Sequence, residues 1–466
     1  AGGKLNLSGV LSGGSAMEKT GAGTLVLSGS SANTMSGLLT VGAGEVVLSK
    51  AANTSALGGA VTVASDATLR TTAANQFGNN LATVNGTLNL ADNSQSLALR
   101  GSGTVSLGAA TLTNNVGGSD TFAGKITGTG NLVKTGTGTA FLSGSSDYTG
   151  TTTVSNGTLE VQNANALGTS AGGAIVADTA TLKIFNAGAM TVADAIQING
   201  VGDNSQGALR SVGGSNTVSG AVTLGANSRI GATGGNLTLS GGVAGGSHVL
   251  FVGGANNTLI SSVISGAGNA QSGTTTSLFK DGDGVLTLSG NNNYSGDARI
   301  TAGAVTVATG GNLGNGTSDV FISSGATLNV NASSQVASLR ETDTGNGGVA
   351  TIGSGATLTV SGNAYNGFMN SISGEGNLVK SGTGTMNLYG AQTYTGTTTV
   401  SGGKLSSAVG IDSSAITVSG GTFETTVANV VGNTTAVTVN SGTYSVGGSD
   451  SIGAISGSGG AIDVTS

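Results

Sequence analysis

Apolar residues alternate with polar ones in short stretches along the whole chain. Pairs such as Leu25 and Leu27, or Leu286 and Leu288, lie two positions apart, and each pair is followed by a glycine. A period of two predicts strands that bury one face. The glycines predict corners, because glycine adopts positive φ at no steric cost. Strands this short cannot bury a core alone, so we expect successive coils of the chain to stack and pair in parallel.

One stretch of the sequence occurs twice. Residues 128–159 and 374–405 align without gaps and share 22 of 32 positions. Weaker copies start at Met17 and near Leu278. Long repeat units therefore lie at about residues 17–48, 126–161, 264–307 and 372–405. Internal repeats of this length are typical of stacked architectures.

A shorter motif fills the gaps between the long units. It consists of an apolar strand, a few turn residues and a Thr-apolar pair, and it ends at Leu69, Leu182, Leu328, Leu358, Phe423 and Tyr444. A Leu-Gly pair recurs at presumed corners, at residues 57–58, 167–168 and 313–314. Composition does not shift along the chain. We therefore expect residues 1–466 to form a single continuous β-helix of unequal coils.

The composition excludes several classes of protein. The chain has 87 glycines and no proline, but glycine has no period of three, which excludes collagen. With 37% apolar and 8% charged residues it does not resemble a disordered chain. The best helical candidate, residues 187–198, contains Gly188 and fits a strand nearly as well. The lack of cysteine fits both a reducing compartment and an exported chain.

Charge and hydropathy argue against two kinds of partner. The net charge is −6 and the 15 basic residues are scattered singly, which disfavours nucleic-acid binding. No apolar run approaches the roughly 18 residues of a membrane span, so we expect no transmembrane segment.

The long units resemble a known repeat. The motif Leu-x-Lys-x-Gly-x-Gly-x-x-x-Leu-x-Gly at residues 132–144 and 378–390 is followed by Tyr-x-Gly-x-x-x-Val-x-x-Gly-x-Leu at 148–159 and 394–405. These residues resemble the autotransporter-associated β-strand repeat (passenger-associated transport repeat) of autotransporter passenger domains. The resemblance implies an all-β fold, a right-handed single-stranded parallel β-helix or β-solenoid in an elongated rod. It also implies exposure at the surface of a Gram-negative-type bacterium.

Four isolated features of the sequence resemble parts of catalytic or metal sites. His248 is the single histidine, and residues 168–172, GTSAG, faintly resemble the serine segment of subtilisin-like proteases. We interpret them as a strand histidine and an ordinary corner. Asp281 and Asp283 stand where the copy at residues 134–138 has the sequence KTGTG, but the remaining calcium ligands of known loops are missing, so a substituted turn is expected. No catalytic, cofactor-binding or metal-binding residue is predicted.

Recurring basic residues receive structural interpretations. Arg100, Arg210 and Arg340 each follow a leucine, which indicates coil edges and no cluster. A second recurring set, Lys19, Lys134, Lys280 and Lys380, is expected to cover apolar surface with its stems and keep its amines in water.

The favoured function is a non-enzymatic surface or extracellular protein: an adhesin, a biofilm scaffold or a fibre subunit. Expected partners are other copies of the chain, by lateral or end-to-end assembly, and glycans or proteins of a cell surface or matrix. A carbohydrate-active β-helix enzyme, a polysaccharide lyase or hydrolase, is the main alternative, and a carboxylate pair beside an arginine in one groove would distinguish it. A functional amyloid is the third hypothesis.

Overall fold

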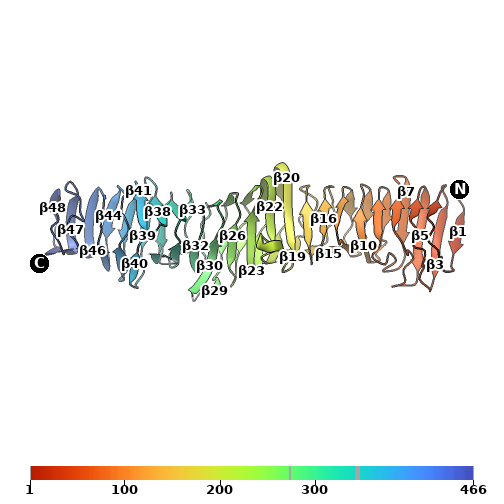
Figure 1. Cartoon of the computed structure of the whole chain (residues 1–466), viewed down its shortest axis with the longest axis horizontal. Helices are drawn as coiled ribbons and strands as arrows, with labels where there is room; N and C mark the ends of the chain where they lie inside the picture. The colour runs from red at the N-terminus through yellow and green to blue at the C-terminus, as the bar shows by residue number, and fades with distance from the viewer. Residues whose placement is uncertain (1, 272–273, 342–346, 465–466) are drawn as a thin grey trace. The chain divides into compact units, whose positions relative to one another are not determined.

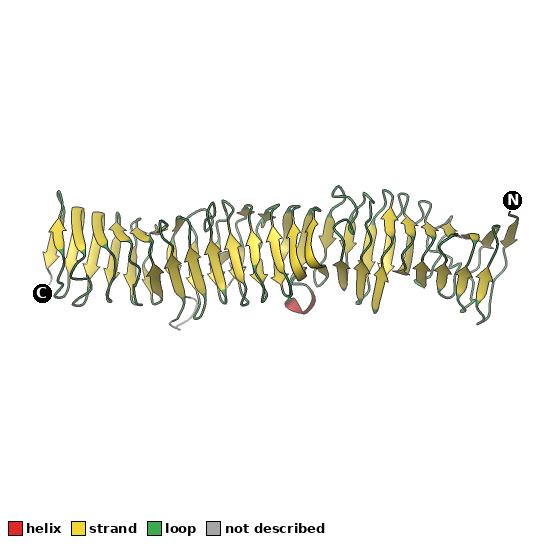
Figure 2. Cartoon of the chain, turned by 90° about the horizontal axis from the view of Figure 1, so that it is seen from above, coloured by secondary structure: helices red, strands yellow, loops and turns green. Residues whose placement is uncertain are grey.

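The computed structural model describes residues 2–271, 274–341 and 347–464, and nearly all of its elements are short strands. Within these ranges the one helical element is a single 3-10 turn, η1 (Asp203–Ser205), drawn in red in Figure 2. The helical candidate at residues 187–198 lies in strands β20 (Thr181–Val192) and β21 (Ile196–Gly200). No helix among the described residues is long and apolar enough to cross a membrane. The all-β prediction is confirmed.

The chain divides into two units. Unit 1 comprises Ala1–Val222 and Gly234–Asn236, and unit 2 comprises Thr223–Thr233 and Leu237–Ser466. In unit 1, a seven-stranded sheet contains every second strand, in the order β1 (Lys4–Leu7), β3 (Thr24–Gly29), β5 (Gly44–Lys50), β7 (Ala67–Thr71), β9 (Thr87–Asn89), β11 (Thr104–Ser106) and β14 (Lys125–Thr127). Figure 1 shows these strands in red and orange, following one another in chain order.

A second parallel series in unit 1 starts among these strands and continues beyond β14. It runs through β2 (Met17–Lys19), β4 (Leu39–Val41), β6 (Val61–Val63), β8 (Leu81–Val84), β10 (Gln95–Arg100), β12 (Leu112–Asn115), β15 (Leu132–Thr135), β17 (Thr152–Val154) and β19 (Ala174–Val176). Each strand therefore pairs with its equivalent one coil away, as the repeat pattern predicts. The parallel β-solenoid is confirmed, and its right-handed sense stays a prediction.

Register places like residues over like residues in the interior. Leu25 pairs with Val46, Val46 with Leu69, and Leu69 with Leu88, and all four side chains are buried. Burying a side chain of this size contributes roughly 1.5–3 kcal/mol. A strand too short to bury a core on its own thus gains one from the coils on either side of it.

Unit 2 has the same organisation. Its C-terminal sheet contains β36 (Ser334–Val336), β39 (Thr357–Val360), β42 (Asn377–Lys380), β44 (Thr397–Val400), β46 (Ala415–Thr425), β45 (Lys404–Ser407), β43 (Thr385–Leu388), β40 (Asn366–Phe368), β47 (Ala436–Val446), β48 (Ala454–Ser456) and β49 (Ala461–Val464). The rings of Phe423 and Tyr444, which pair across two coils, stack with their centroids 5.5 Å apart. The short motif thus supplies interior residues.

Coil lengths differ, as the spacing of the repeats predicts. Thr87 pairs with Thr104, 17 residues later, whereas Leu250 pairs with Leu278, 28 residues later. The longer coil carries β29 (Asn269–Gln271), which pairs antiparallel with β30 (Thr274–Lys280). A solenoid tolerates such insertions because each coil contacts only its neighbours.

Candidate functional site

Three of the four recurring lysines, Lys134, Lys280 and Lys380, are buried inside the solenoid, so the prediction that their amines stay in water is wrong for them, whereas Lys19 is half-buried. Lys134 is 0% exposed. Its Nζ donates hydrogen bonds to the carbonyl oxygens of Thr135 at 2.6 Å, Gly136 at 2.9 Å and Asn156 at 3.1 Å. An ammonium carries three donors, and the corner offers three carbonyls. The lysine therefore ties its own corner to the corner of the next coil.

The same arrangement recurs in the other three long units. The carbonyl acceptors are those of Asp281, Gly282 and Ala302 for Lys280, of Ser381, Gly382 and Gly402 for Lys380, and of Thr20, Gly21 and Ala43 for Lys19. Burial lowers the pKa of Lys134 and that of Lys280 to about 8. Both amines are therefore mostly protonated at neutral pH, and the motif lysine is a structural residue.

A buried tyrosine and a glycine form the next corner of the long unit. Tyr148 is fully buried, and the Leu-Gly corner of the following coil crosses its ring at Gly168, with φ +87°. A Cβ at Gly168 would lie 2.3 Å from the Tyr148 carbonyl oxygen. Gly314 has the same relation to Tyr294. In two of the three Leu-Gly pairs the glycine is therefore required because a side chain would clash with the buried tyrosine, whereas Gly58 lies against the backbone of Met35.

A lateral groove of about 400 Å³ opens beside this corner in unit 1. We call it the unit 1 groove, and its lining comes from four segments: Lys125; Ser145, Ser146 and Asp147; Ala164, Asn165, Gly168, Thr169 and Ser170; and Thr191, Ala193 and Asp194. The Lys125 Nζ lies 2.6 Å from the Asp147 Oδ2. Both of these side chains are about half exposed, so the pair lies at the rim.

Two oxygens of the unit 1 groove have no hydrogen-bond partner. Asp194, between β20 and β21, is 2% exposed, and its Oδ1 is unpaired. The hydroxyl of Thr169 is also buried and unpaired. Burial raises the pKa of Asp194, because desolvation disfavours the carboxylate. A buried polar atom without a hydrogen-bond partner costs free energy. A ligand that donates a hydrogen bond at the base of the groove would remove this cost.

Unit 2 has a groove at the equivalent place in its own repeat. Residues 145–147 and 168–170 of the unit 1 groove correspond, at a constant offset of 146, to residues 291–293 and 314–316, which line a groove of about 380 Å³. This groove is lined by amides and hydroxyls. Its Asn292 is already bonded, since its Oδ1 accepts from the Ile264 N–H at 2.8 Å and its Nδ2 donates to the Asn312 carbonyl at 2.9 Å.

The sequence-based protease candidate finds no support in this geometry. The expectation that His248 lies in a strand is wrong. His248 lies in the turn between β25 (Val243–Ala244) and β26 (Leu250–Gly253), where its backbone N–H donates to the Gly245 carbonyl. Residues 168–172 form a corner, and Ser170 is exposed at the unit 1 groove. No histidine lines that groove.

The acidic turn and the arginines make separate ion pairs. Asp281 forms a two-pronged pair with Arg229 at 2.8 and 2.5 Å. Arg100 pairs with Asp120, and Arg340 with Asp319 at 3.0 Å. Burial lowers the pKa of Arg210. The described residues contain no group of three or more acidic, histidine or cysteine side chains placed to hold a metal.

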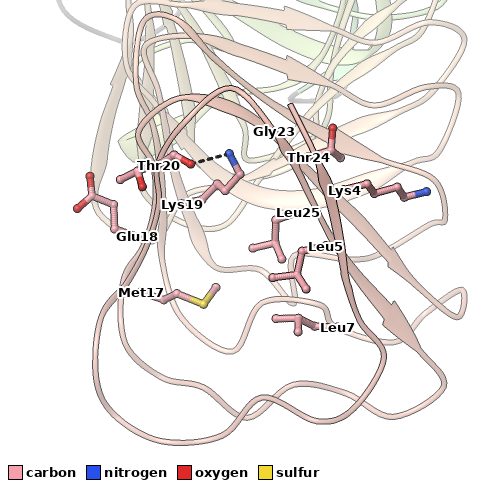
Figure 3. Close-up of a pocket in the computed structure, with 11 residues that line it drawn as sticks. Lys4, Leu5, Leu7, Met17, Glu18, Lys19, Thr20, Gly23, Thr24 and Leu25 are labelled. Carbon is pink, nitrogen blue, oxygen red and sulfur yellow. Dashed lines mark hydrogen bonds between the residues drawn. The ribbon is translucent and has the colours of Figure 1, made fainter. Parts of the chain in front are cut away.

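A further hollow, of about 520 Å³, lies at the first coils of unit 1 (Figure 3). Figure 3 shows Leu5, Leu7 and Leu25 gathered in it, with Lys19 turned towards the carbonyl of Thr20. Leu5 pairs with Leu25, which continues the inner stack of the solenoid. The hollow is therefore lined by the first members of this inner stack, where Leu5 is still 58% exposed.

Two exposed tyrosines stand out on the surface of unit 2. Tyr365 is 68% and Tyr389 is 44% exposed, their hydroxyls lie 3.3 Å apart, and Met369, which directly follows β40 (Asn366–Phe368), is also exposed. By contrast, Tyr148, Tyr294, Tyr394 and Tyr444 are buried. The exposed pair offers aromatic surface to the solvent.

Comparison with known proteins identifies the repeats. The Passenger-associated-transport-repeat family model matches residues 17–48, 132–161, 278–307 and 378–406. The Adhesin BmaC autotransporter of Brucella suis biovar 1 (strain 1330) is 34% identical over 315 residues, which are 66% of this chain and 8% of that protein. No solved structure matches the chain. The expected resemblance is confirmed.

Proposed function

We propose that this chain, a region of passenger-associated transport repeats distantly homologous to an autotransporter adhesin, acts as a non-enzymatic adhesive surface outside a Gram-negative-type bacterium. The observation that carries the proposal is the similarity to the adhesin over 66% of the chain. The chain spans about 8% of the length of that relative, so the adhesive role of the whole relative is extended to this chain as a proposal only.

The side-chain arrangement supports an adhesive surface. Ion pairs such as Arg70–Glu45 at 2.9 Å and Lys404–Glu424 at 2.6 Å join neighbouring coils and so brace the solenoid. Strand edges and corners instead present serine, threonine and asparagine. Many weak contacts of this kind, repeated along one chain, give avidity without a strong single site. The exposed Tyr365 and Tyr389 add aromatic contact area of the type enriched in binding surfaces.

Adhesion of coated beads tests this proposal. Beads that carry the purified chain should attach to epithelial monolayers or to immobilised matrix saturably, and soluble chain should compete. Albumin-coated beads and beads carrying heat-unfolded chain are the controls. Attachment no greater than that of albumin-coated beads would contradict the proposed adhesive function.

One observation bears on the alternative that the chain is a carbohydrate-active enzyme. The unit 1 groove brings Asp147 and Asp194 into one lining, as a glycosidase would require. The groove contains Lys125 and no arginine, and the Lys125 ammonium pairs with Asp147. Release of reducing ends from acidic or neutral polysaccharides is the test, and we expect none. Self-association stays a prediction that sedimentation of the purified chain would check.

A further inference from the structure

The unit 1 groove is a built feature of the repeat and not an accident of loose packing. Its lining includes the corner at Gly168, where a Cβ would lie 2.3 Å from the carbonyl oxygen of Tyr148, so this corner admits only glycine. The equivalent groove recurs in unit 2 at the same repeat positions. What distinguishes unit 1 is the base, where Asp194 and Thr169 each hold a buried oxygen without a partner.

The lining indicates what chemistry would fit. Around the unpaired Asp194 and Thr169 oxygens lie the exposed side chains of Asn165, Ser170 and Thr191, which donate and accept hydrogen bonds. A ligand that offers closely spaced hydroxyls matches such a set, because each hydroxyl both donates and accepts. We propose that the unit 1 groove binds a saccharide, with Asp194 accepting a hydrogen bond from a sugar hydroxyl at the base of the groove. The proposal deepens the proposed adhesive function and rests on it.

The charged side chains of the groove lining indicate which class of saccharide fits. The lining contains two aspartates and one lysine, and the lysine is paired with Asp147 at the rim. The remaining carboxylate, Asp194, repels an anionic ligand over a short range in a partly desolvated site. Neutral sugars and amino sugars therefore fit better than uronic acids.

A divalent cation is the competing occupant, and the lining disfavours it. Calcium takes six to eight oxygen ligands, usually with several carboxylates among them. Here one of the two carboxylates is engaged by Lys125, and no group of three metal-ligating side chains exists among the residues the structure describes. The binding experiment therefore includes calcium as a separate probe.

Direct binding of the full 466-residue chain to a panel of neutral oligosaccharides tests the proposal. The panel contains chitotriose, mannotriose, lactose and maltotriose, with trigalacturonate as the anionic member and calcium chloride alone as the cation probe. We expect at least one neutral member to bind, and trigalacturonate to bind at least ten-fold more weakly than it. Two variants locate the site. Ser170→Trp, at an exposed position of the lining, should abolish binding by filling the groove, and Asp194→Asn should weaken it at least ten-fold.

Matched controls separate a specific loss from misfolding. Thr137→Trp places the same bulk at an exposed corner outside the groove and should leave binding unchanged. Absence of binding to every panel member, binding unaffected by Ser170→Trp, or calcium binding lost in Asp194→Asn would each overturn the saccharide assignment. Beads carrying the Ser170→Trp variant separate the two proposals. If these beads still attach while the wild-type chain binds no saccharide, the assignment fails and the adhesive function stands.

Discussion

The hydroxyl of Tyr394 lies 2.6 Å from the hydroxyl of Thr398, and both side chains are fully buried. Tyr148 and Thr152 form the same contact in another long unit. In the third unit the equivalent of the threonine is Ala298, and the hydroxyl of Tyr294 has no hydrogen-bond partner. This repeat thus has the buried tyrosine without the threonine that satisfies its hydroxyl in the other two.

This difference predicts opposite effects for the same substitution. Tyr394→Phe removes a buried hydrogen bond and should lower the free energy of unfolding by about 1 kcal/mol. Tyr294→Phe removes an unpaired hydroxyl, and its effect should lie between neutral and a gain of about 1 kcal/mol. Urea unfolding of the two variants against wild type makes the comparison. A larger loss for Tyr294→Phe than for Tyr394→Phe would contradict it.

Gly168 should tolerate no side chain. Its φ is +87°, and a Cβ would lie 2.3 Å from the carbonyl oxygen of Tyr148, so Gly168→Ala should cost about 2 kcal/mol or more. Gly117 is the control, because nothing lies within 4 Å of a Cβ built there. Gly117→Ala should change stability by less than about 0.5 kcal/mol. Thermal and urea unfolding measure both, and equal effects would show that the corner relaxes around a methyl group.

The lysine corner predicts a large loss when the ammonium is removed. Lys134→Met keeps the buried stem but leaves three carbonyl oxygens without their donor, so we expect a loss of about 2–4 kcal/mol. Lys125→Met, which removes an exposed ion pair in the same unit, should cost no more than about 1 kcal/mol. If hydrogen exchange of the amides around residues 132–161 is unchanged in Lys134→Met, the lysine is not a structural tie.

Stability should depend on pH in a defined direction on the alkaline side. The pKa of Lys134 and that of Lys280 are lowered by burial to about 8, so between about pH 8 and pH 10.5 the unfolded chain binds more protons than the folded one. The free energy of unfolding should therefore rise with pH in that window on account of these lysines.

Above about pH 10 a second set of groups reverses the slope. Burial raises the pKa of Tyr148, Tyr294 and Tyr394, so these phenols ionise first in the unfolded chain and stability falls. Urea midpoints from pH 7 to 11 should pass through a maximum. Lys134→Met should flatten the rise and leave the fall in place, and an unchanged rise in that variant would contradict the assignment.

The fold was predictable because it depends on local pattern. Alternating pairs such as Leu286 and Leu288, followed by glycine, required one buried face and a corner, and both residues are 0% exposed. The position of Lys134 was not predictable from exposure statistics. A lysine is normally solvated, and only the folded structure shows that its corner directs three carbonyls towards the ammonium.

The unit 1 groove was missed because its residues are far apart in the sequence. Lys125, Asp147 and Asp194 belong to different coils, and no motif connects them. One signal was available. The constant offset of 146 between residues 145–147 and 291–293 marks the same corner in two repeats, and comparison of the two shows where charge replaces amide. The burial of Asp194 depends on coil stacking, which a linear pattern does not reveal.

Asp194 should lower the stability of the chain, and this separates a binding role from a structural one. Burial raises its pKa, so the unfolded carboxyl loses its proton at a lower pH than the folded one, and stability falls as pH rises through that interval. The cost remains at pH 7. Asp194→Asn removes the charge and should raise the free energy of unfolding at pH 7 by about 1 kcal/mol, while Asp147→Asn, at the exposed rim, should change it by less than about 0.5 kcal/mol.

Urea unfolding at pH 4 and pH 7 checks this, since the advantage of Asp194→Asn over wild type should shrink at the lower pH, because the raised pKa favours protonation of the wild-type carboxyl there. If Asp194→Asn makes the chain more stable and also abolishes saccharide binding, Asp194 serves ligand binding at a cost in stability. If Asp194→Asn instead destabilises the chain by more than about 1 kcal/mol at both pH values, the carboxylate is a structural acceptor. The loss of binding in that variant would then reflect a distorted corner. In that case only Ser170→Trp would test whether the saccharide binds in the unit 1 groove.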